Sequence, residues 1–340
     1  MKVCLCRLAF VFTWVCLLSS SSTAEQPIKI LQSDDAPSFM AFLNEGRRLL
    51  AVGRNNSWAT IWDLSANTVK ASFKTHWPAR ACAISPDQST LATLGDGRVT
   101  LYDIGTTKRV NWIPYDGVPS FSPDGKTLAI ASNGLRRIVL WDLSSSRDRS
   151  ILVNVDRPVH CLGFGSSGKL LACAGEGSAI CLWEVESGRQ AGTLKGHPEA
   201  GRVDHIAFST KEKVLASTAV RLGKDIAPAE VGLPNDAGAV LAIRENLGAE
   251  IRIWEPDSRK LLVTLPTRAM RINILEFSPS GRLLVAGFDK SVVVWNTFTW
   301  KQLKTFDHDD EVLSATVSPD EKHLAIGTWD KRIVIWKLAN

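Results

Sequence analysis

Short apolar runs alternate with polar turns along most of the chain. The clearest copy of this pattern extends from Phe121 to Leu143 and reads FSPDGKTLAIASNGLRRIVLWDL. Ser122-Pro123-Asp124-Gly125 and Asn133-Gly134 are turn signals, because proline fixes φ and glycine tolerates positive φ. The runs Thr127–Ser132 and Ile138–Leu143 are short and bounded by these turns, which is typical of buried strands. The pattern therefore predicts β-structure, not helices.

The same unit recurs along the chain, and one aromatic residue marks the end of a strand in each copy. These residues are Trp62, Tyr102, Trp141, Trp183, Trp254, Trp295 and Trp336. Their separations are 40, 39, 42, 71, 41 and 41 residues, so five of the six agree within three residues. One more apolar run follows each of the first six aromatic residues, giving four strands per unit. A single four-stranded sheet cannot bury both of its faces, whereas seven sheets packed radially can.

Seven units of about 40 residues, Ser-Pro-Asp turns and Trp-Asp strand ends resemble the WD-repeat family of β-propellers. The resemblance covers Ile28 to Asn340. It implies an all-β fold, a seven-bladed β-propeller of four-stranded antiparallel blades. The last Trp-led strand stops near the C-terminus, and Ile28–Leu31 is an otherwise unpaired strand. The resemblance implies that this N-terminal strand closes the last blade.

The resemblance also implies that the repeated His, Asp and Trp side chains form hydrogen bonds inside the blades and do not catalyse. The family's Gly-His pair occurs literally as Gly196-His197, and His76 and His308 take the equivalent place elsewhere. Asn56 replaces the turn aspartate in the first repeat, and the third to fifth repeats lack it. The residues assigned this structural role are Trp62, Asp63, Asp96, Tyr102, Asp103, Trp141, Asp142, Trp183, His197, Trp254, Asp289, Trp295, His308, Asp330 and Trp336.

The fifth repeat is about 30 residues longer than the others. The extra residues, about 219–246, fall between the predicted second and third strands and are rich in turn signals. Loops of this length are often functional. A tolerated surface insertion is an equally good interpretation, because the entropy of loop closure grows only logarithmically with length.

The first 24 residues have the pattern of a secretory signal peptide. Lys2 and Arg7 precede an apolar run from Leu8 to Leu18, and a polar segment then leads to Ala24. The apolar run is too short for a membrane-spanning helix, so we expect no transmembrane anchor after cleavage. We therefore predict an exported protein, periplasmic or extracellular, with residues 25–340 forming one propeller domain.

Charge and cysteine content exclude several classes of function. The net charge of +5 falls to +3 (38 − 35) without Lys2 and Arg7, which is too mild to predict nucleic-acid binding. Four cysteines remain after position 24, and their spacings match no zinc motif. Counting from the turns places Cys161 opposite Cys173, and Cys173 opposite Cys181. Export would permit one disulfide bridge here, although buried thiols are the favoured interpretation.

Residues that enter the first strand of each repeat, and those in the second-to-third turn, are expected to share one face around the ring axis. Tryptophan and arginine among them are typical of interface hot spots. The Ser122–Gly125 turn lies on the opposite face, which we expect to carry no site. The candidate partner-binding residues are Trp58, Trp77, Arg80, His160, Asp204, His205, Arg268, Asn273, Phe288 and Trp329.

The sequence contains no nucleophile elbow, phosphate loop, paired-histidine zinc motif or dinucleotide fingerprint. We expect no catalytic residue, no metal and no cofactor, and a function as a scaffold that binds a protein or peptide. The alternative is an extracytoplasmic propeller enzyme or small-ligand binder at the axial mouth, similar to a lactone hydrolase or a quinone-cofactor enzyme. Only His160, Asp204 and His205 approach the constellation that such an enzyme needs.

Overall fold

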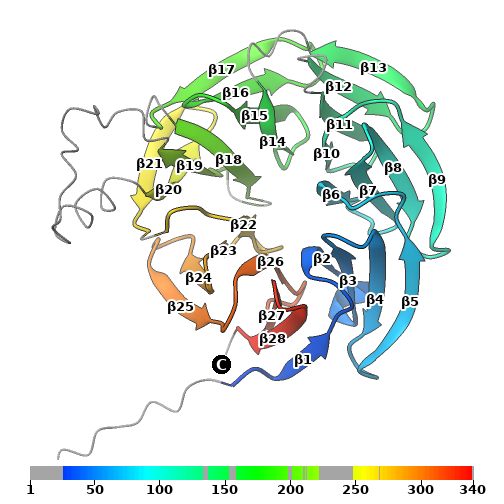
Figure 1. Cartoon of the computed structure of the whole chain (residues 1–340). Coiled ribbons are helices and arrows are strands. Elements are labelled where there is room, and N and C mark those ends of the chain that lie inside the picture. Colours follow the sequence, from blue (N-terminus) through cyan, green and yellow to red (C-terminus); the bar gives the residue numbers. More distant parts are fainter. Residues whose placement is uncertain are drawn as a thin grey trace, which may run out of the picture.

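The computed structural model describes residues 26–132, 137–152, 158–197, 201–209, 211, 213–221, 248–267 and 269–338. These residues form 28 strands in seven four-stranded antiparallel sheets, arranged as a ring (Figure 1). The all-β, seven-bladed architecture predicted from the sequence period is confirmed. The predicted signal peptide, residues 1–24, lies outside the described residues.

Each blade contributes its first strand to the centre of the ring and its last strand to the circumference (Figure 1). Blade 1 holds β2 (Pro37–Leu43), β3 (Arg48–Gly53), β4 (Trp58–Asp63) and β5 (Thr68–Lys74), with a 3₁₀ turn η1 (Asn44–Gly46). Blade 2 holds β6 (Ala81–Ile84), β7 (Thr90–Gly95), β8 (Arg98–Asp103) and β9 (Lys108–Ile113). Blade 3 holds β10 (Gly117–Phe121), β11 (Thr127–Ser132), β12 (Arg137–Asp142) and β13 (Arg147–Leu152). Blade 4 holds β14 (Val159–Phe164), β15 (Leu170–Gly175), β16 (Ala179–Glu184) and β17 (Gln190–Lys195).

The remaining three blades complete the ring. Blade 5 holds β18 (Gly201–Phe208), β19 (Leu215–Arg221), β20 (Ala249–Glu255) and β21 (Lys260–Leu265). Blade 6 holds β22 (Ile274–Phe277), β23 (Leu283–Phe288), β24 (Ser291–Asn296) and β25 (Gln302–Asp307). Blade 7 holds β26 (Val312–Val317), β27 (His323–Thr328) and β28 (Arg332–Lys337), and its outermost strand is β1 (Lys29–Gln32).

The N-terminal strand closes the ring. β1 pairs antiparallel with β28, with Lys29 opposite Ile335 and Leu31 opposite Ile333. Leu31 is only 3% exposed and packs in the cluster that joins blades 7 and 1. Just after β1, the buried Asp35 carboxylate accepts backbone hydrogen bonds from Asn55 and Asn56 at 2.5 and 2.8 Å. The closing strand is therefore held both to the last blade and to the first.

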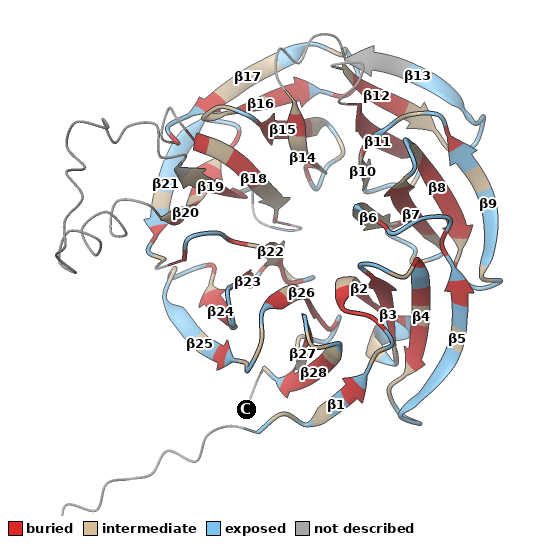
Figure 2. Cartoon of the chain, viewed as in Figure 1, coloured by how far each residue is buried: buried red, intermediate tan, exposed pale blue. Residues whose placement is uncertain are grey.

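The apolar cores lie between neighbouring blades, and Figure 2 shows burial concentrated on the middle strands of each blade. All six residues of β11 are buried, whereas the outer strand β5 buries only Phe73. Second strands are apolar on both faces because each sheet packs against two neighbours. The outermost strands alternate instead, because one of their faces meets water.

The Ser-Pro-Asp turns owe their shape to side-chain hydrogen bonds. In blade 3, the Ser122 hydroxyl donates to the Asp124 carboxylate at 2.5 Å and accepts from the Thr127 N–H at 2.9 Å. The hydroxyl of Ser122 lowers the pKa of Asp124. Gly125 follows with φ of +69°, a conformation that glycine adopts without strain. Blade 7 repeats the arrangement with Ser318 and Asp320.

The structure corrects one detail of the cysteine register. Cys161 lies opposite Ala174, not opposite Cys173, because a bulge between Val159 and Cys161 shifts the pairing by one residue. Cys173 does lie opposite Cys181, as the turn count predicts. None of the four described cysteines is part of a disulfide bridge.

The long interval of the fifth repeat falls between β19 and β20, the second and third strands of blade 5. β19 extends to Arg221, so the first three residues of the predicted insertion belong to a strand. The rest of the insertion, and also Asn133-Gly134, lie outside the described residues.

A test of ring closure compares two neighbouring residues of β1. Leu31→Ala should lower the free energy of unfolding by about 2–4 kcal/mol, because it leaves a cavity between blades 7 and 1. Ile30→Ala is the matched control, since Ile30 is 51% exposed and should change stability little. Urea denaturation of both variants gives the measurement. Equal effects at the two positions would mean that β1 does not seal the ring.

Candidate protein-interaction face

One face of the ring gathers the connections that enter the first strands and those that join second to third strands. An open cavity of about 840 Å³ lies there at the axial mouth. Its lining comes from blades 1, 2, 5, 6 and 7, which are five of the seven blades around the axis. Lining residues that could contact a ligand are Arg54, Trp77, Arg80, His205, Arg271, Asn273 and Glu311.

Three exposed tryptophans belong to this face. Trp58 starts β4, Trp77 lies between β5 and β6, and Trp329 lies between β27 and β28; they are 43%, 51% and 46% exposed. The Arg54 guanidinium lies over the Trp329 ring, 5.4 Å from its centroid. Large exposed aromatic side chains lose little conformational entropy when they are covered, which makes them favourable contacts for a partner.

The axial mouth carries side chains of both charges, with more arginines than acidic groups. Arg54, Arg80 and Arg271 line the cavity together with Asp96 and Glu311. Asp96 is already paired with Arg98 at 2.9 Å. Glu311 accepts a hydrogen bond from the Asn273 amide at 3.2 Å. Arg80 and Arg271 are exposed, so their guanidinium groups can reach acidic groups or carbonyls of a partner.

The three side chains that the enzyme interpretation requires, His160, Asp204 and His205, have different surroundings. Asp204 is buried, and Arg202 donates to its Oδ1 at 2.6 Å while the Arg271 Nε lies 4.0 Å from its Oδ2. Burial lowers the pKa of His205, which favours the neutral imidazole. The buried Nε2 of His160 has no hydrogen-bond partner among the described residues. Among all the residues that the structure describes, no three His, Cys, Asp or Glu side chains are grouped so that they could hold a metal ion.

The predicted face residues divide into two groups. Trp77, Arg80, His205 and Asn273 line the axial cavity, whereas Trp58, His160, Asp204, Phe288 and Trp329 lie outside its lining. Phe288 is half-buried at the end of β23, and Arg268 lies outside the described residues. Three charged lining residues, Arg54, Arg271 and Glu311, were not predicted from the sequence. They could have been found, because each occupies a turn of the two kinds used to select the others.

A buried hydrogen-bond network connects blade 5 from its entry to its third strand. The His197 Nε2 lies 2.7 Å from the Ser217 hydroxyl, and its Nδ1 lies 2.9 Å from the Glu250 carboxylate. The Trp254 indole donates to the same hydroxyl at 2.8 Å. Glu250 thus takes the place of the turn aspartate that this repeat lacks. Burial opposes ionisation of Glu250, but its bond from His197 and the nearby Arg252 charge outweigh this and lower its pKa.

Serine, histidine and a carboxylate in this order also match the geometry of a nucleophilic triad. Ser217 is 0% exposed, however, and its oxygen already accepts the indole hydrogen bond of Trp254. A substrate carbonyl cannot reach the hydroxyl from solvent. The network therefore acts on the stability of blade 5 and not on catalysis.

The hydrogen-bond partner of the strand-end aromatic residue differs from blade to blade. The aromatic residue pairs with a leucine of the second strand, and its hydrogen-bond partner depends on the residue two positions after that leucine. Ser217 accepts from Trp254, and the Cys173 sulfur accepts from the Trp183 indole at 3.4 Å. Where this position is Ala51, Ile130 or Ile326, it offers no acceptor. In those blades the buried Nε1 atoms of Trp62, Trp141 and Trp336 lack a partner among the described residues.

The remaining aromatic and histidine residues of the repeats vary in the same way. In blade 2 the Tyr102 hydroxyl accepts from the His76 backbone N–H at 2.8 Å. Trp295 is buried in blade 6. His308 meets the Trp336 ring edge-on, with centroids 5.8 Å apart, but its buried Nε2 has no partner in the described part of the chain. The implied His–Trp network is therefore complete in blade 5 and broken in blade 7.

The aspartates of the repeats hold turns. Asp63 accepts from the backbone of Ser65 and Ala66, and Asp142 accepts from that of Ser145. Hydroxyl groups of Ser65 and Ser144 contribute most to lowering the pKa of Asp63 and Asp142 to about 2. Further members of this set are Asp103, which accepts from Thr106, Asp330, which accepts from Thr328 and Arg332, and Asp289, at a turn position with φ of +48°.

Besides Asp204 of β18, a second carboxyl group lies on an innermost strand of the described part of the chain. Glu276 is the third residue of β22, and its carboxylate accepts from the Thr316 hydroxyl of β26 at 3.2 Å. The equivalent positions in the other blades hold only small residues, namely Ala41, Ala83, Ser120, Gly163, Ala207 and Thr316. Burial raises the pKa of Glu276 to about 8, against a smaller opposing effect of the Thr316 bond. An acidic residue inside the apolar run Ile274–Phe277 was the sequence signal for it.

Comparison with known proteins agrees with this geometry. The family model described as WD domain, G-beta repeat matches residues 67–103, 259–296 and 300–337. The rice guanine nucleotide-binding protein subunit beta is 23% identical over 302 residues, covering 81% of this chain and 74% of its own length. The U3 small nucleolar RNA-associated protein 15 homolog of Xenopus tropicalis is 24% identical over 274 residues, covering 76% of this chain and 52% of its own length.

A third relative is the zebrafish p21-activated protein kinase-interacting protein 1-like, 24% identical over 222 residues, 59% of this chain and 58% of its own length. The seven four-stranded blades define the class, a seven-bladed β-propeller. The family model finds WD repeats in three stretches of the chain, so this seven-bladed β-propeller contains WD repeats.

The blade 5 network can be tested at Ser217. Ser217→Ala should lower the free energy of unfolding by about 2 kcal/mol, because it leaves the Trp254 indole and His197 without their buried partner. Ser217→Cys should lose less, since the Cys173 sulfur accepts an indole hydrogen bond in blade 4. Chemical denaturation with a urea series compares the two. Equal losses would indicate that the hydroxyl matters only for packing.

The raised pKa of Glu276 predicts that the stability of the protein depends on pH. Its pKa rises from 4.5 to about 8 on folding, so the folded chain holds the proton more tightly than the unfolded chain. The stability that the protonated Glu276 carboxyl contributes is therefore fully present below pH 4.5 and is lost as pH rises through 8. Between pH 5 and 8, Glu276→Gln should gain at least ~1.4 kcal/mol relative to the wild type, the equivalent of one pKa unit. The free energy of unfolding of both proteins is measured across this pH range. If it changes with pH in the same way for the variant and the wild type, the prediction is wrong.

Proposed function

We propose that this protein is an exported, non-catalytic interaction platform that binds a protein or peptide at the axial mouth. The observation that carries the proposal is the combination of three exposed tryptophans with exposed arginines around an open cavity. This combination is typical of binding hot spots, in which large aromatic and guanidinium groups contribute most of the affinity. The distribution of the lining over five blades suits a segment of a partner that lies across the axis.

The names of relatives support a protein partner. One is a subunit of a guanine nucleotide-binding protein, and another is described as kinase-interacting. The U3 relative is associated with RNA by its name, but the mouth of this chain sets three arginines against two acidic groups, a weak field for a polyanion. A protein or peptide partner with accessible acidic and apolar groups fits the mouth better.

The export part of the proposal rests on the sequence before position 25. A basic start, an apolar run and a small-residue cleavage pattern occur in the order that a secretory signal requires. None of the helical segments in the described part of the chain has the length and apolarity of a membrane span. Mass spectrometry of the N-terminus of the native protein tests export, with Glu25 as the expected first residue.

The binding proposal is tested with the double variant Arg80→Glu, Trp329→Ala. Both residues are exposed, so the fold should be unchanged while partner affinity falls at least about tenfold, the loss of one or two hot-spot residues. Crosslinking followed by pull-down from the native extracytoplasmic fraction identifies the partner, and calorimetry then measures affinity for wild type and variant.

The matched control is Phe298→Ala, Lys301→Glu, which removes one exposed aromatic residue and one cation from the opposite face. Phe298 is 66% exposed in the turn between β24 and β25, so this variant should keep full affinity. If the Arg80 and Trp329 variant binds as the wild type does, then the axial mouth is not the binding site.

A further inference from the structure

Two cysteines of blade 4 lie directly opposite each other on neighbouring strands. Cys173 of β15 pairs with Cys181 of β16 in the antiparallel ladder. Both belong to the apolar cluster between blades 3 and 4, in which Cys173 is buried and Cys181 is partly buried. Opposite residues of such a ladder have their side chains on one face of the sheet and their Cα atoms about 4.5–5.5 Å apart. A disulfide bridge joins cysteines whose Cα atoms are about 4.4–6.8 Å apart, so this pair is placed for one.

The other two described cysteines are not placed to compete for this bridge. Cys161 packs in the cluster between blades 4 and 5, on the opposite face of the same sheet. Its thiol lies 3.5 Å from the Ala174 carbonyl oxygen and 3.7 Å from that of Val203. Cys82 belongs to β6 of blade 2. Among the described cysteines, only Cys173 and Cys181 share both a ladder position and a face.

The propeller fold itself does not require two thiols at this place. The corresponding pair is Ile130 with Val139 in blade 3, and Ile326 with Val334 in blade 7. The ladders of the remaining blades hold no cysteine there either. Apolar side chains fill the position well enough, so the two thiols of blade 4 add chemistry that packing alone does not need.

The two thiols already interact, and they differ in their access to solvent. A hydrogen bond between them, together with burial, raises the pKa of Cys173 well above its usual value. The Trp183 indole donates to the Cys173 sulfur at 3.4 Å. Cys173 is 1% exposed, whereas Cys181 is partly exposed. An oxidant that arrives from solvent therefore meets Cys181 first, and Cys173 waits beside it.

We propose that Cys173 and Cys181 are a redox pair, which an oxidant of the disulfide class converts into a cross-strand disulfide bridge. The Cys181 thiol loses its proton, and its sulfur attacks one sulfur of the oxidant, which forms a mixed disulfide and releases one thiolate. The Cys173 thiol then loses its proton, and its sulfur attacks the Cys181 sulfur, which forms the bridge and releases the second thiolate. The two cysteines lose two electrons and two protons, and the oxidant gains them as two thiols.

The two steps differ in rate, and neither needs a bound partner. The raised pKa of Cys173 keeps its thiolate scarce at neutral pH, so the second step is slower than the first. Export, as proposed above, brings the pair into a compartment where disulfide oxidants are present. The reaction itself requires neither export nor a ligand at the axial mouth.

The experiment treats the folded, reduced protein, beginning at Glu25, with glutathione disulfide in the absence of denaturant. After an acid quench, N-ethylmaleimide in urea blocks the remaining thiols, and mass spectrometry counts them. We expect two of the four thiols to disappear, with the loss of two hydrogen atoms and no attached glutathione. Trypsin followed by Glu-C cleaves after Glu176, between the two cysteines, so the bridge joins two peptides that separate on reduction. Circular dichroism before and after the reaction checks that the protein stays folded.

Serine variants separate the roles of the two thiols. Cys173→Ser should fold normally, because Ser217 accepts the corresponding indole hydrogen bond in blade 5. It should keep glutathione on Cys181 as a stable mixed disulfide. In Cys181→Ser the remaining buried thiol should react at least tenfold more slowly than the wild-type pair. Cys82→Ser is the matched control, since Cys82 is also partly exposed, and it should form the bridge at the wild-type rate.

Three results would overturn the proposal. The folded wild type could keep all four thiols, which would mean that the oxidant does not reach the pair. Glutathione could remain on Cys181 of the wild type, which would mean that Cys173 does not attack the mixed disulfide. The digest could also join a different pair, such as Cys161 with Cys173, which would mean that the ladder position does not select the partners.

Discussion

Every blade of this ring depends on its neighbours to cover two apolar faces. The residues of β11 are buried on both sides of their sheet, which is possible only when blades 2 and 4 are both in place. The constraint becomes most demanding in blade 7, because its strands come from both ends of the chain and β1 leads directly into β2 of blade 1. The β1–β28 ladder and the buried Leu31 solve the problem by taking one strand of blade 7 from the start of the chain. In every other blade the four strands follow one another along the chain, whereas blade 7 is completed by pairing between the two ends of the chain.

The features that could be read from the sequence are those that repeat. The spacing of the strand-end aromatic residues gave the number of blades, and the unpaired Ile28–Leu31 run indicated how the ring closes. Both depend on local turn signals and on strand periodicity, which act the same way in every unit. The Cys173–Cys181 pairing was predictable for the same reason, because a regular hairpin fixes its own register.

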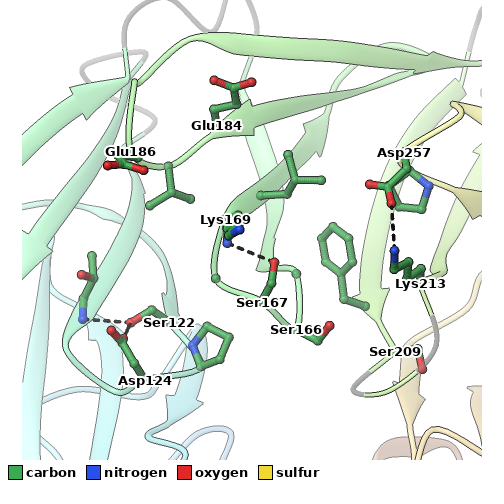
Figure 3. Close-up of a pocket in the computed structure, with 18 of the residues that line it drawn as sticks. Ser122, Asp124, Ser166, Ser167, Lys169, Glu184, Glu186, Ser209, Lys213 and Asp257 are labelled. Carbon is green, nitrogen blue, oxygen red and sulfur yellow. Dashed lines mark hydrogen bonds and ion pairs between the residues drawn. The ribbon is translucent and has the colours of Figure 1, made fainter.

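The features that escaped prediction depend on one unit differing from the others. A bulge after Val159 moved Cys161 out of the counted register, and no local signal marks it. Glu250 replaced the missing turn aspartate from another position, because a longer side chain reaches His197 from the strand. The mouth residues Arg54, Arg271 and Glu311 were missed although their turns were recognised. An open cavity beside Phe208 is lined by residues of three blades (Figure 3), so a search for motifs within one repeat cannot find it.

The closing pair of strands also sets the order in which the ring can be completed. Lys29 and Ile335 are direct partners although almost the entire chain separates them. A chain made or translocated from its N-terminus presents β1 first and must keep that strand edge unpaired until β28 follows. Contacts of such long sequence separation form slowly, because the entropy of closing the loop is lost before the contact is gained. The last step of folding is thus fixed by topology, and until it occurs both open ends of the propeller expose strand edges to other chains.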